Sequence, residues 1–172
     1  MRKSILAGFV IMILLTSCKK GEIVPTHGIA TIDNTTAQSQ TYYIYGFLFS
    51  EAKLVSTLDN PDPDITVDSD GTYIYLQTTN LYNSFYKYGS YNDSISAIAA
   101  FNSLTSFDIS LWEEWAEKVE SNQIWIFRTG TECYAKIRII SIVSEPGSPR
   151  DFGKCTFEWV YQPDGTLTFP GK

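Results

Sequence analysis

The feature that most constrains the fold is a two-residue alternation in the last third of the chain. In residues 133–143 two sets of side chains alternate: Cys133, Ala135, Ile137 and Ile139 against Tyr134, Lys136 and Arg138. Residues 155–161 repeat the pattern: Cys155, Phe157, Trp159 and Tyr161 against Thr156, Glu158 and Val160. Side chains two residues apart share one face of a strand, so both runs predict strands. The connection 144–153 contains two Pro and two Gly, which predicts a loop and an antiparallel hairpin.

The remaining secondary structure follows from composition and spacing. Aromatic and β-branched runs predict strands at 41–50, 53–58, 65–67, 72–77, 124–128 and 166–169. A helical stripe at 93–104 carries Ile95, Ile98 and Phe101. A second helix is predicted from Ser110 as N-cap to about residue 121, with Trp115 and Val119 on its apolar side. We expect a mainly β fold, with antiparallel sheets and one or two helices inserted near residues 93–121.

The N-terminus predicts an export signal. Two basic residues precede the apolar run 5–15, which is shorter than the ~20 residues that a membrane span needs. The run ends in Leu-Thr-Ser-Cys18, which resembles the bacterial lipobox whose cysteine receives the lipid. The alternative is an N-terminal helix that happens to end in cysteine.

Three segments follow from this pattern. We predict a signal peptide over 1–17, a lipidated N-terminus and flexible tether over 18–40, and a single β-rich domain over 41–172. The tether is rich in Thr, Gln and Ser. Lipidation of Cys18 would attach the protein to the outer membrane, facing either the periplasm or the cell surface.

Removing residues 1–17 limits the available chemistry. Both Met residues leave with the signal, and the only His, His27, lies in the predicted tether. The domain then has no imidazole for a multi-histidine zinc site or a Ser-His-Asp triad, so we expect no catalytic residues, no metal site and no enzyme. Loss of two basic residues changes the net charge from -6 to -8, which argues against a nucleic-acid partner.

Two groups of residues leave alternatives open. Cys133 and Cys155 form a disulfide or remain free; the hairpin favours free thiols, because it places them at opposite ends of the two strands. Five aspartates between residues 59 and 70 either bind Ca²⁺ or cap turns, and their spacing matches no EF-hand loop.

The segment 80–92, rich in Tyr, Asn, Ser and Gly, predicts a surface loop and a candidate ligand site. It carries four tyrosines: Tyr82, Tyr86, Tyr88 and Tyr91. Rings with a polar tip suit flat hydrophobic ligands such as porphyrins and also suit sugars. The alternative is ordinary packing, because Tyr also fits the surface of a sheet.

Several short motifs resemble the HmuY family of haem-binding lipoproteins from Bacteroides-type bacteria. They are Tyr-Gly-Phe-Leu-Phe-Ser at 45–50, Gln-Ile-Trp-Ile-Phe-Arg-Thr at 123–129, Tyr-Ala-Lys-Ile at 134–137 and Phe-Glu-Trp-Val-Tyr-Gln-Pro-Asp-Gly at 157–165. The resemblance implies a mostly β fold, an outer-membrane lipid anchor and capture of haem. The family's His or Met iron ligands are missing here, which leaves the four tyrosines as candidates. The rival interpretation is a non-enzymatic surface lipoprotein that binds glycan or protein partners.

Overall fold

The computed structural model describes residues 24–35, 43–79, 83–109 and 111–170. The predicted signal peptide and Cys18 lie outside the described residues, as do Tyr82 and Ser110. The fold is mainly β, as predicted, with antiparallel sheets and a single short α-helix. Its elements are β1 (His27–Asp33), β2 (Tyr45–Leu48), η2 (Phe49–Glu51), β3 (Lys53–Ser56), β4 (Thr66–Ser69), β5 (Ile74–Gln77), β6 (Phe85–Ser90), α1 (Ser94–Ser103), β7 (Ala116–Val119), β8 (Gln123–Arg128), β9 (Tyr134–Glu145) and β10 (Phe152–Gln162).

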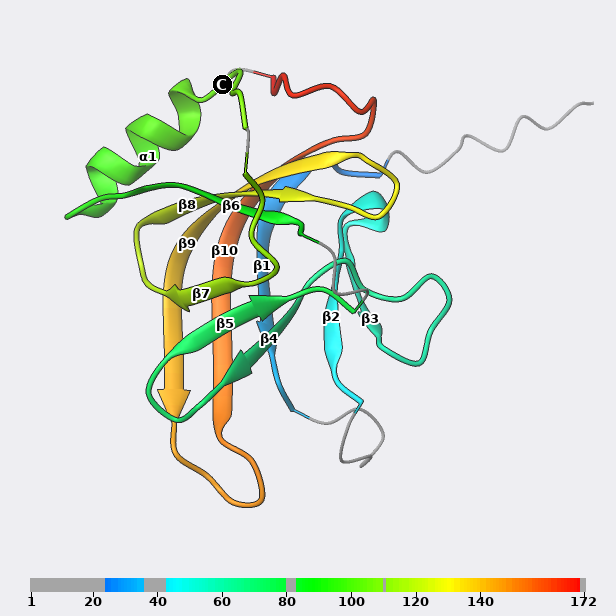
Figure 1. Ribbon diagram of the computed structural model, residues 1–172, viewed down its shortest axis with the longest axis vertical. Coiled ribbons are helices and arrows are strands. Elements are labelled where there is room, and N and C mark those ends of the chain that lie inside the picture. Colours follow the sequence, from blue (N-terminus) through cyan, green and yellow to red (C-terminus); the bar gives the residue numbers. More distant parts are fainter. Residues whose placement is uncertain (1–23, 36–42, 80–82, 110, 171–172) are drawn as a thin grey trace, which may run out of the picture.

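A five-stranded antiparallel sheet in the order β1-β10-β9-β8-β6 forms the centre of the molecule (Figure 1). Two smaller antiparallel sheets, β2-β3 and β4-β5-β7, pack on one face of it, and α1 packs on the other. The long β9–β10 hairpin predicted from the alternation is confirmed, and it extends beyond the rest of the sheet at its loop end (Figure 1). Among the described residues, no helix is long and apolar enough to cross a membrane.

The two faces of the central sheet belong to two separate cores. Ala135, Ile137 and Ile139 of β9 enter the larger core together with Phe157 and Trp159 of β10. The other side of these strands meets α1 and the C-terminal segment, where Val160 packs with Phe101 and Phe169. The predicted division of faces is therefore confirmed, but both faces are buried.

Lys136 is the extreme case of a polar side chain on the second face, because it is 0% exposed. Its Nζ donates hydrogen bonds to the carbonyl oxygens of Phe101 and Leu104, at 2.7 and 2.8 Å, where α1 ends. The ammonium also lies over the rings of Phe101 and Phe169. A buried cation that caps the negative end of the helix thus attaches α1 to the sheet.

The predicted tether contains a strand. Residues His27–Asp33 form β1, which pairs with β10 over seven residues, and Ile32 of this strand is buried in the larger core. The prediction of a flexible segment over 18–40 is therefore wrong for this strand, and the domain begins before residue 41. The physical reason is that β10 would otherwise be an edge strand with unpaired backbone groups.

The second predicted helix is also wrong. Ala116–Val119 is the strand β7, paired with β5. Ala116 and Val119 are three positions apart, yet both point into the core, because the register shifts between their partners Leu76 and Ile74. A β-bulge adds one residue to a strand, so it produces the spacing of three that resembles a helical stripe.

The apolar stripe predicted for α1, the one α-helix of the described residues, is confirmed for Phe101 and wrong for Ile95 and Ile98. Ala97 and Phe101 face the sheet, whereas Ile95 is 78% exposed and Ile98 is 40% exposed. Asp93 is the N-cap and accepts a hydrogen bond from the Ser96 amide at 2.8 Å.

The predicted irregular loop 80–92 contains β6, which pairs with β8. Its aromatic residues fit an edge strand, and the register shift between Lys87 and Gly89 interrupts the alternation that would have revealed it.

Candidate functional site

A polar groove passes the turn between β8 and β9, and we call it the Gly130 groove because all three of its hollows are lined by Gly130. The first hollow, about 370 Å³, lies between this turn and the segment that follows β2, and Tyr161 of β10 also lines it. The second, about 40 Å³, lies beside Asp64 and Thr78. The third, about 370 Å³, reaches Asn83 and Glu132. Figure 1 shows the β8–β9 turn beside η2 at this end of the molecule.

Two aspartates on the connection between β3 and β4 supply the negative charge of the groove. Asp62 and Asp64 both line its first and second hollows. The Phe49 amide donates to Oδ2 of Asp64 at 2.8 Å, which fixes this carboxylate against the chain. The Thr79 hydroxyl donates to Asp62.

Burial sets the protonation of Asp64. Desolvation raises its pKa from 3.8 to about 6; the Phe49 hydrogen bond opposes this rise, and the nearby charge of Asp62 adds to it. The Asp64 carboxylate is therefore costly to ionise in the unliganded protein.

Hydroxyl groups form much of the remaining wall. Thr129 Oγ1 forms hydrogen bonds with Thr131 Oγ1 at 3.0 Å and with the Cys133 amide at 3.1 Å, which fixes the β8–β9 turn. The Thr78 hydroxyl has no hydrogen-bond partner in the described structure, although the residue is only 9% exposed. Buried polar groups normally find a partner, so an unpaired hydroxyl beside a hollow indicates a contact that a ligand or water completes.

Arg128 and Tyr161 give the groove its other functional groups. Arg128 donates to the Asn83 carbonyl at 2.7 Å and lies 4.8 Å from the ring centre of Trp112. Tyr161 is buried, and this burial is the main cause of the raised pKa of its phenol. A hydrogen bond with Cys133 raises the pKa further. The phenol is therefore a neutral hydrogen-bonding group.

The tyrosines predicted to bind ligand lie elsewhere. Tyr86 packs with Phe101 and Ile126 in the core under α1, and Tyr88 is 40% exposed on the edge strand β6. Tyr91 lies against Gly89, and burial raises the pKa of its phenol. None of these three lines the Gly130 groove, and Tyr82 lies outside the described residues. Packing on the sheet accounts for Tyr86 and Tyr91.

The cysteines remain free, as the hairpin predicted. Cys155 pairs with Ile142, nine residues along β9 from Cys133, which corresponds to roughly 30 Å of strand. Burial raises the pKa of the Cys155 thiol to about 12. Cys133 is only partly buried and lies next to the groove, 3.3 Å from the Pro163 carbonyl oxygen.

The aspartates that were compared with a calcium site divide between distant places. Asp59 accepts from the Ser56 amide, and Asp70 accepts from the backbone amide and side-chain hydroxyl groups of its own hairpin. Within the described ranges, no three His, Cys, Asp or Glu residues gather in a way that could hold a metal ion. The described contacts of these two residues are those of turn-capping aspartates.

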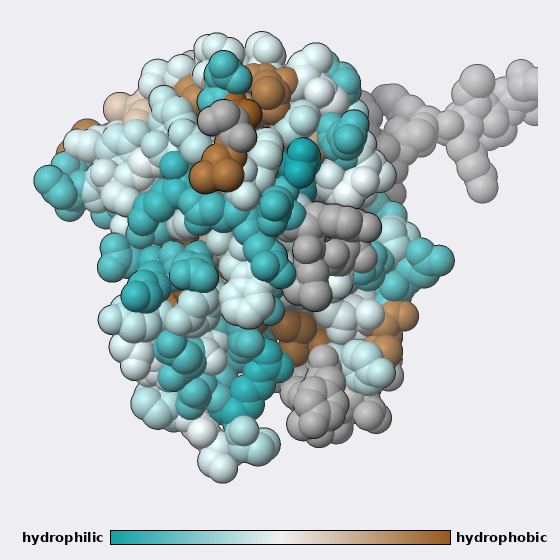
Figure 2. Space-filling view, in the orientation of Figure 1, coloured by the Kyte–Doolittle hydropathy of each residue, from teal (hydrophilic) through white to brown (hydrophobic). Residues whose placement is uncertain are grey.

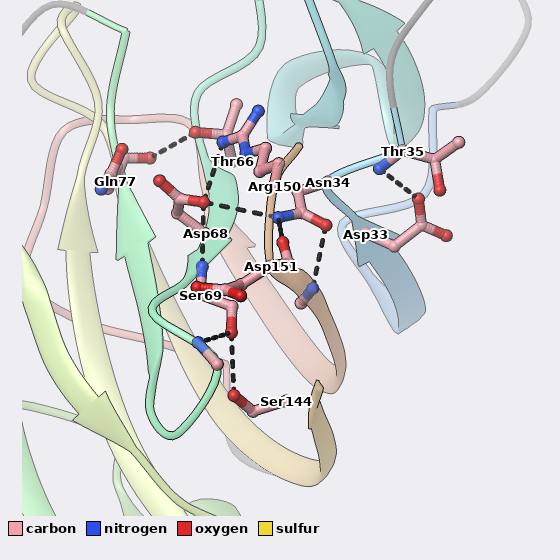
Figure 3. Close-up of polar contacts among 12 residues, drawn as sticks. Asp33, Asn34, Thr35, Thr66, Asp68, Ser69, Gln77, Ser144, Arg150 and Asp151 are labelled. Carbon is pink, nitrogen blue, oxygen red and sulfur yellow. Dashed lines mark hydrogen bonds and ion pairs between the residues drawn. The ribbon is translucent and has the colours of Figure 1, made fainter. Parts of the chain in front are cut away.

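A second polar cluster lies at the loop end of the β9–β10 hairpin (Figure 3). Asp68 of β4 forms an ion pair with Arg150 at 2.8 Å. Asn34 donates to the Asp151 carbonyl and accepts from the Gly153 amide. Figure 3 shows these side chains pointing toward one another, so the cluster ties β1, β4 and the hairpin together.

Sequence reasoning missed the Gly130 groove. Its residues come from five separate segments of the chain, and the two aspartates were interpreted as turn residues or as ligands of a calcium ion. The Pro-Asp-Pro-Asp motif at 61–64 was the available signal, because proline fixes the backbone that presents both carboxylates.

The face drawn in Figure 2 is largely hydrophilic, with small separate hydrophobic areas, and so offers no large apolar patch.

Comparison with known proteins gives no family. No family model matches the chain, and no curated protein matches it. The resemblance to the HmuY family stays a prediction from short motifs.

Proposed function

We propose that this protein is a lipid-anchored, extracytoplasmic binding protein that captures a glycan in the Gly130 groove. The observation that carries the proposal is the groove itself, in which carboxylates and hydroxyls surround an unpaired buried hydroxyl of Thr78. Sugars present several hydroxyl groups, each of which donates and accepts hydrogen bonds. Carboxylates, hydroxyls and a guanidinium are suitable partners for them.

The groove argues against haem as its ligand. A haem site needs apolar walls and an axial ligand to iron. Here carboxylates line the hollows, and haem carries two propionates that would meet this negative charge. Tyr161, the one tyrosine among the described residues that line the groove, has a raised phenol pKa, which disfavours the phenolate that binds iron.

The proposal assigns binding and no chemical step. Both aspartates of the groove already accept hydrogen bonds from neighbouring groups, Asp64 from the Phe49 amide and Asp62 from the Thr79 hydroxyl. Lipidation at Cys18 would place the domain beside the membrane, within reach of polysaccharide outside the cell.

A variant that blocks the groove tests the proposal. A Cβ at Gly130 would meet no atom within 4 Å, so the backbone accepts a side chain there, and Gly130→Trp is designed to fill the groove with a bulky ring. We expect calorimetry against a panel of neutral, amino and acidic oligosaccharides to detect binding by the natural protein and a loss of at least about tenfold in Gly130→Trp. Ala99→Trp, on the exposed side of α1, is the matched control and should bind normally.

Two results would overturn the proposal. One is equal affinity of the Gly130→Trp and natural proteins, and the other is binding of no oligosaccharide in the panel at millimolar concentration. Haemin titration of the same proteins gives the competing outcome: a saturable shift of the Soret band that Gly130→Trp leaves unchanged would favour haem bound at another place.

A further inference from the structure

We propose that the glycan carries a free amino group, whose ammonium binds Asp64 while a neighbouring polar substituent binds Thr78. The ligand class is therefore an oligosaccharide that contains an unacetylated 2-amino-2-deoxy sugar. This inference rests on the proposed glycan binding and names the chemistry of that same groove.

The first argument is an unbalanced charge. The ion pairs of the described residues involve Glu51, Glu158 and Asp68, and none of them involves Asp62 or Asp64. One oxygen of Asp64 accepts from the Phe49 amide, and the carboxylate lines two hollows. A desolvated carboxylate without a cation is poorly stabilised, and an ammonium group would supply the missing charge-assisted hydrogen bond.

The second argument is the unpaired hydroxyl. Thr78 and Asp64 line the same hollow of about 40 Å³, which is too small for a sugar ring but large enough for one substituent. The adjoining hollow of about 370 Å³ has room for the ring itself. An amino group entering the small hollow would reach the carboxylate while the ring stays above.

The charges that surround Asp64 select the sign of the ligand. The charged groups that line the groove beside Asp64 are Asp62 on the same connection, Glu132 on the β8–β9 turn and Arg128 on β8. Two titratable but neutral groups, the Tyr161 phenol on β10 and the Cys133 thiol after the β8–β9 turn, also lie beside it. Arg128 is turned to the Asn83 carbonyl and the Trp112 ring. Three carboxylates against one guanidinium favour a cationic sugar over an acidic one.

Three oligosaccharides that differ at one atom group test the inference. We would compare β-1,4-linked glucose tetrasaccharides that carry at C2 a free amine, an N-acetyl group or a hydroxyl. The natural protein should bind the amine form about tenfold more tightly than the other two. Asp64→Asn keeps the acceptor for the Phe49 amide and should lose this preference, so that its affinities for the three forms become equal.

Two further variants sharpen the result. Asp59→Asn is the matched control, because Asp59 lies on the same connection and its carboxylate accepts a hydrogen bond from the Ser56 amide. This variant should keep the preference for the amine form. Thr78→Val removes only the unpaired hydroxyl and should weaken binding of the amine form. Because burial raises the pKa of Asp64 to about 6, the affinity ratio of natural protein to Asp64→Asn for the amine form should rise from pH 5 to pH 6, where the ligand amine is still protonated.

The outcomes separate the two proposals. Equal binding of all three tetrasaccharides overturns the amino-group inference and leaves glycan binding intact. A preference for the amine that survives in Asp64→Asn also overturns it. Binding of none of the three, together with a failure of the wider oligosaccharide panel, removes both proposals.

Discussion

Asp64→Asn is expected to make the protein more stable, with a difference that appears above about pH 4 and is complete above about pH 6. The substitution keeps an oxygen that accepts the hydrogen bond of the Phe49 amide, and it removes a negative charge that burial disfavours. Binding sites commonly contain residues that lower the stability of the unliganded protein, and we expect Asp64 to be such a residue of the Gly130 groove.

The magnitude follows from the pKa of Asp64, which the fold raises from 3.8 to about 6. Between these pH values the folded protein holds a proton that the unfolded chain has released, so stability falls as the pH rises. A change of roughly two pKa units corresponds to about 3 kcal/mol at pH 7. Asparagine is always neutral, so the variant should gain up to this amount, or about 6 to 12 °C in Tm for a chain of this size.

The assay is chemical denaturation of both proteins, followed by tryptophan fluorescence, at several pH values from 4.5 to 7.5. The fold lowers the pKa of other carboxylates, such as Asp70 and Asp93, and the stability that they contribute is lost in acid. Both proteins contain these carboxylates, so their effect cancels in the difference between the two free energies of unfolding. Asp93→Asn is the control with the opposite sign: it should be less stable than the natural protein at neutral pH, by an amount that shrinks in acid. A variant at Asp64 that is less stable at every pH, or a difference that does not change with pH, would refute the reasoning.

Three other predictions follow from single side chains. Lys136→Met should lower the free energy of unfolding by about 3 kcal/mol, because the carbonyls of Phe101 and Leu104 lose a charged donor. This figure is the net effect, since removal of the buried charge offsets part of the loss. An unchanged denaturation midpoint would contradict this account of how α1 is held. Thr78→Val should raise stability by about 1 kcal/mol, because it removes a buried hydroxyl that has no partner; a loss of stability would show that ordered water already satisfies this group. Cys18→Ala should move the protein from the membrane to the soluble fraction on cell fractionation; unchanged fractionation would mean that the lipobox interpretation is wrong.

The groove could not be read from the sequence because its parts come together only in three dimensions. Asp64 precedes the β4–β5 hairpin and Thr78 follows it, and Gly130 lies some 50 residues later in a turn of another sheet. Tyr86 and Tyr88 attracted attention because four tyrosines are close together in the sequence. The pairing of β6 with β8 directs Tyr86 under α1 instead.

The alternation in residues 133–161 by itself determined the central hairpin, the division of its two faces and the separation of the two thiols. It could do so because the pleat of a strand is local and imposes its period of two on any sequence that buries one face. The tertiary structure decided the roles of segments without a clear period: His27–Asp33 is a strand because β10 needed a partner, and Ala116–Val119 is a strand because a bulge aligned its apolar residues with the core. Burial, which raises the pKa of Asp64 and leaves Thr78 unpaired, likewise depends on neighbours distant in the chain, so only the fold could create the candidate site.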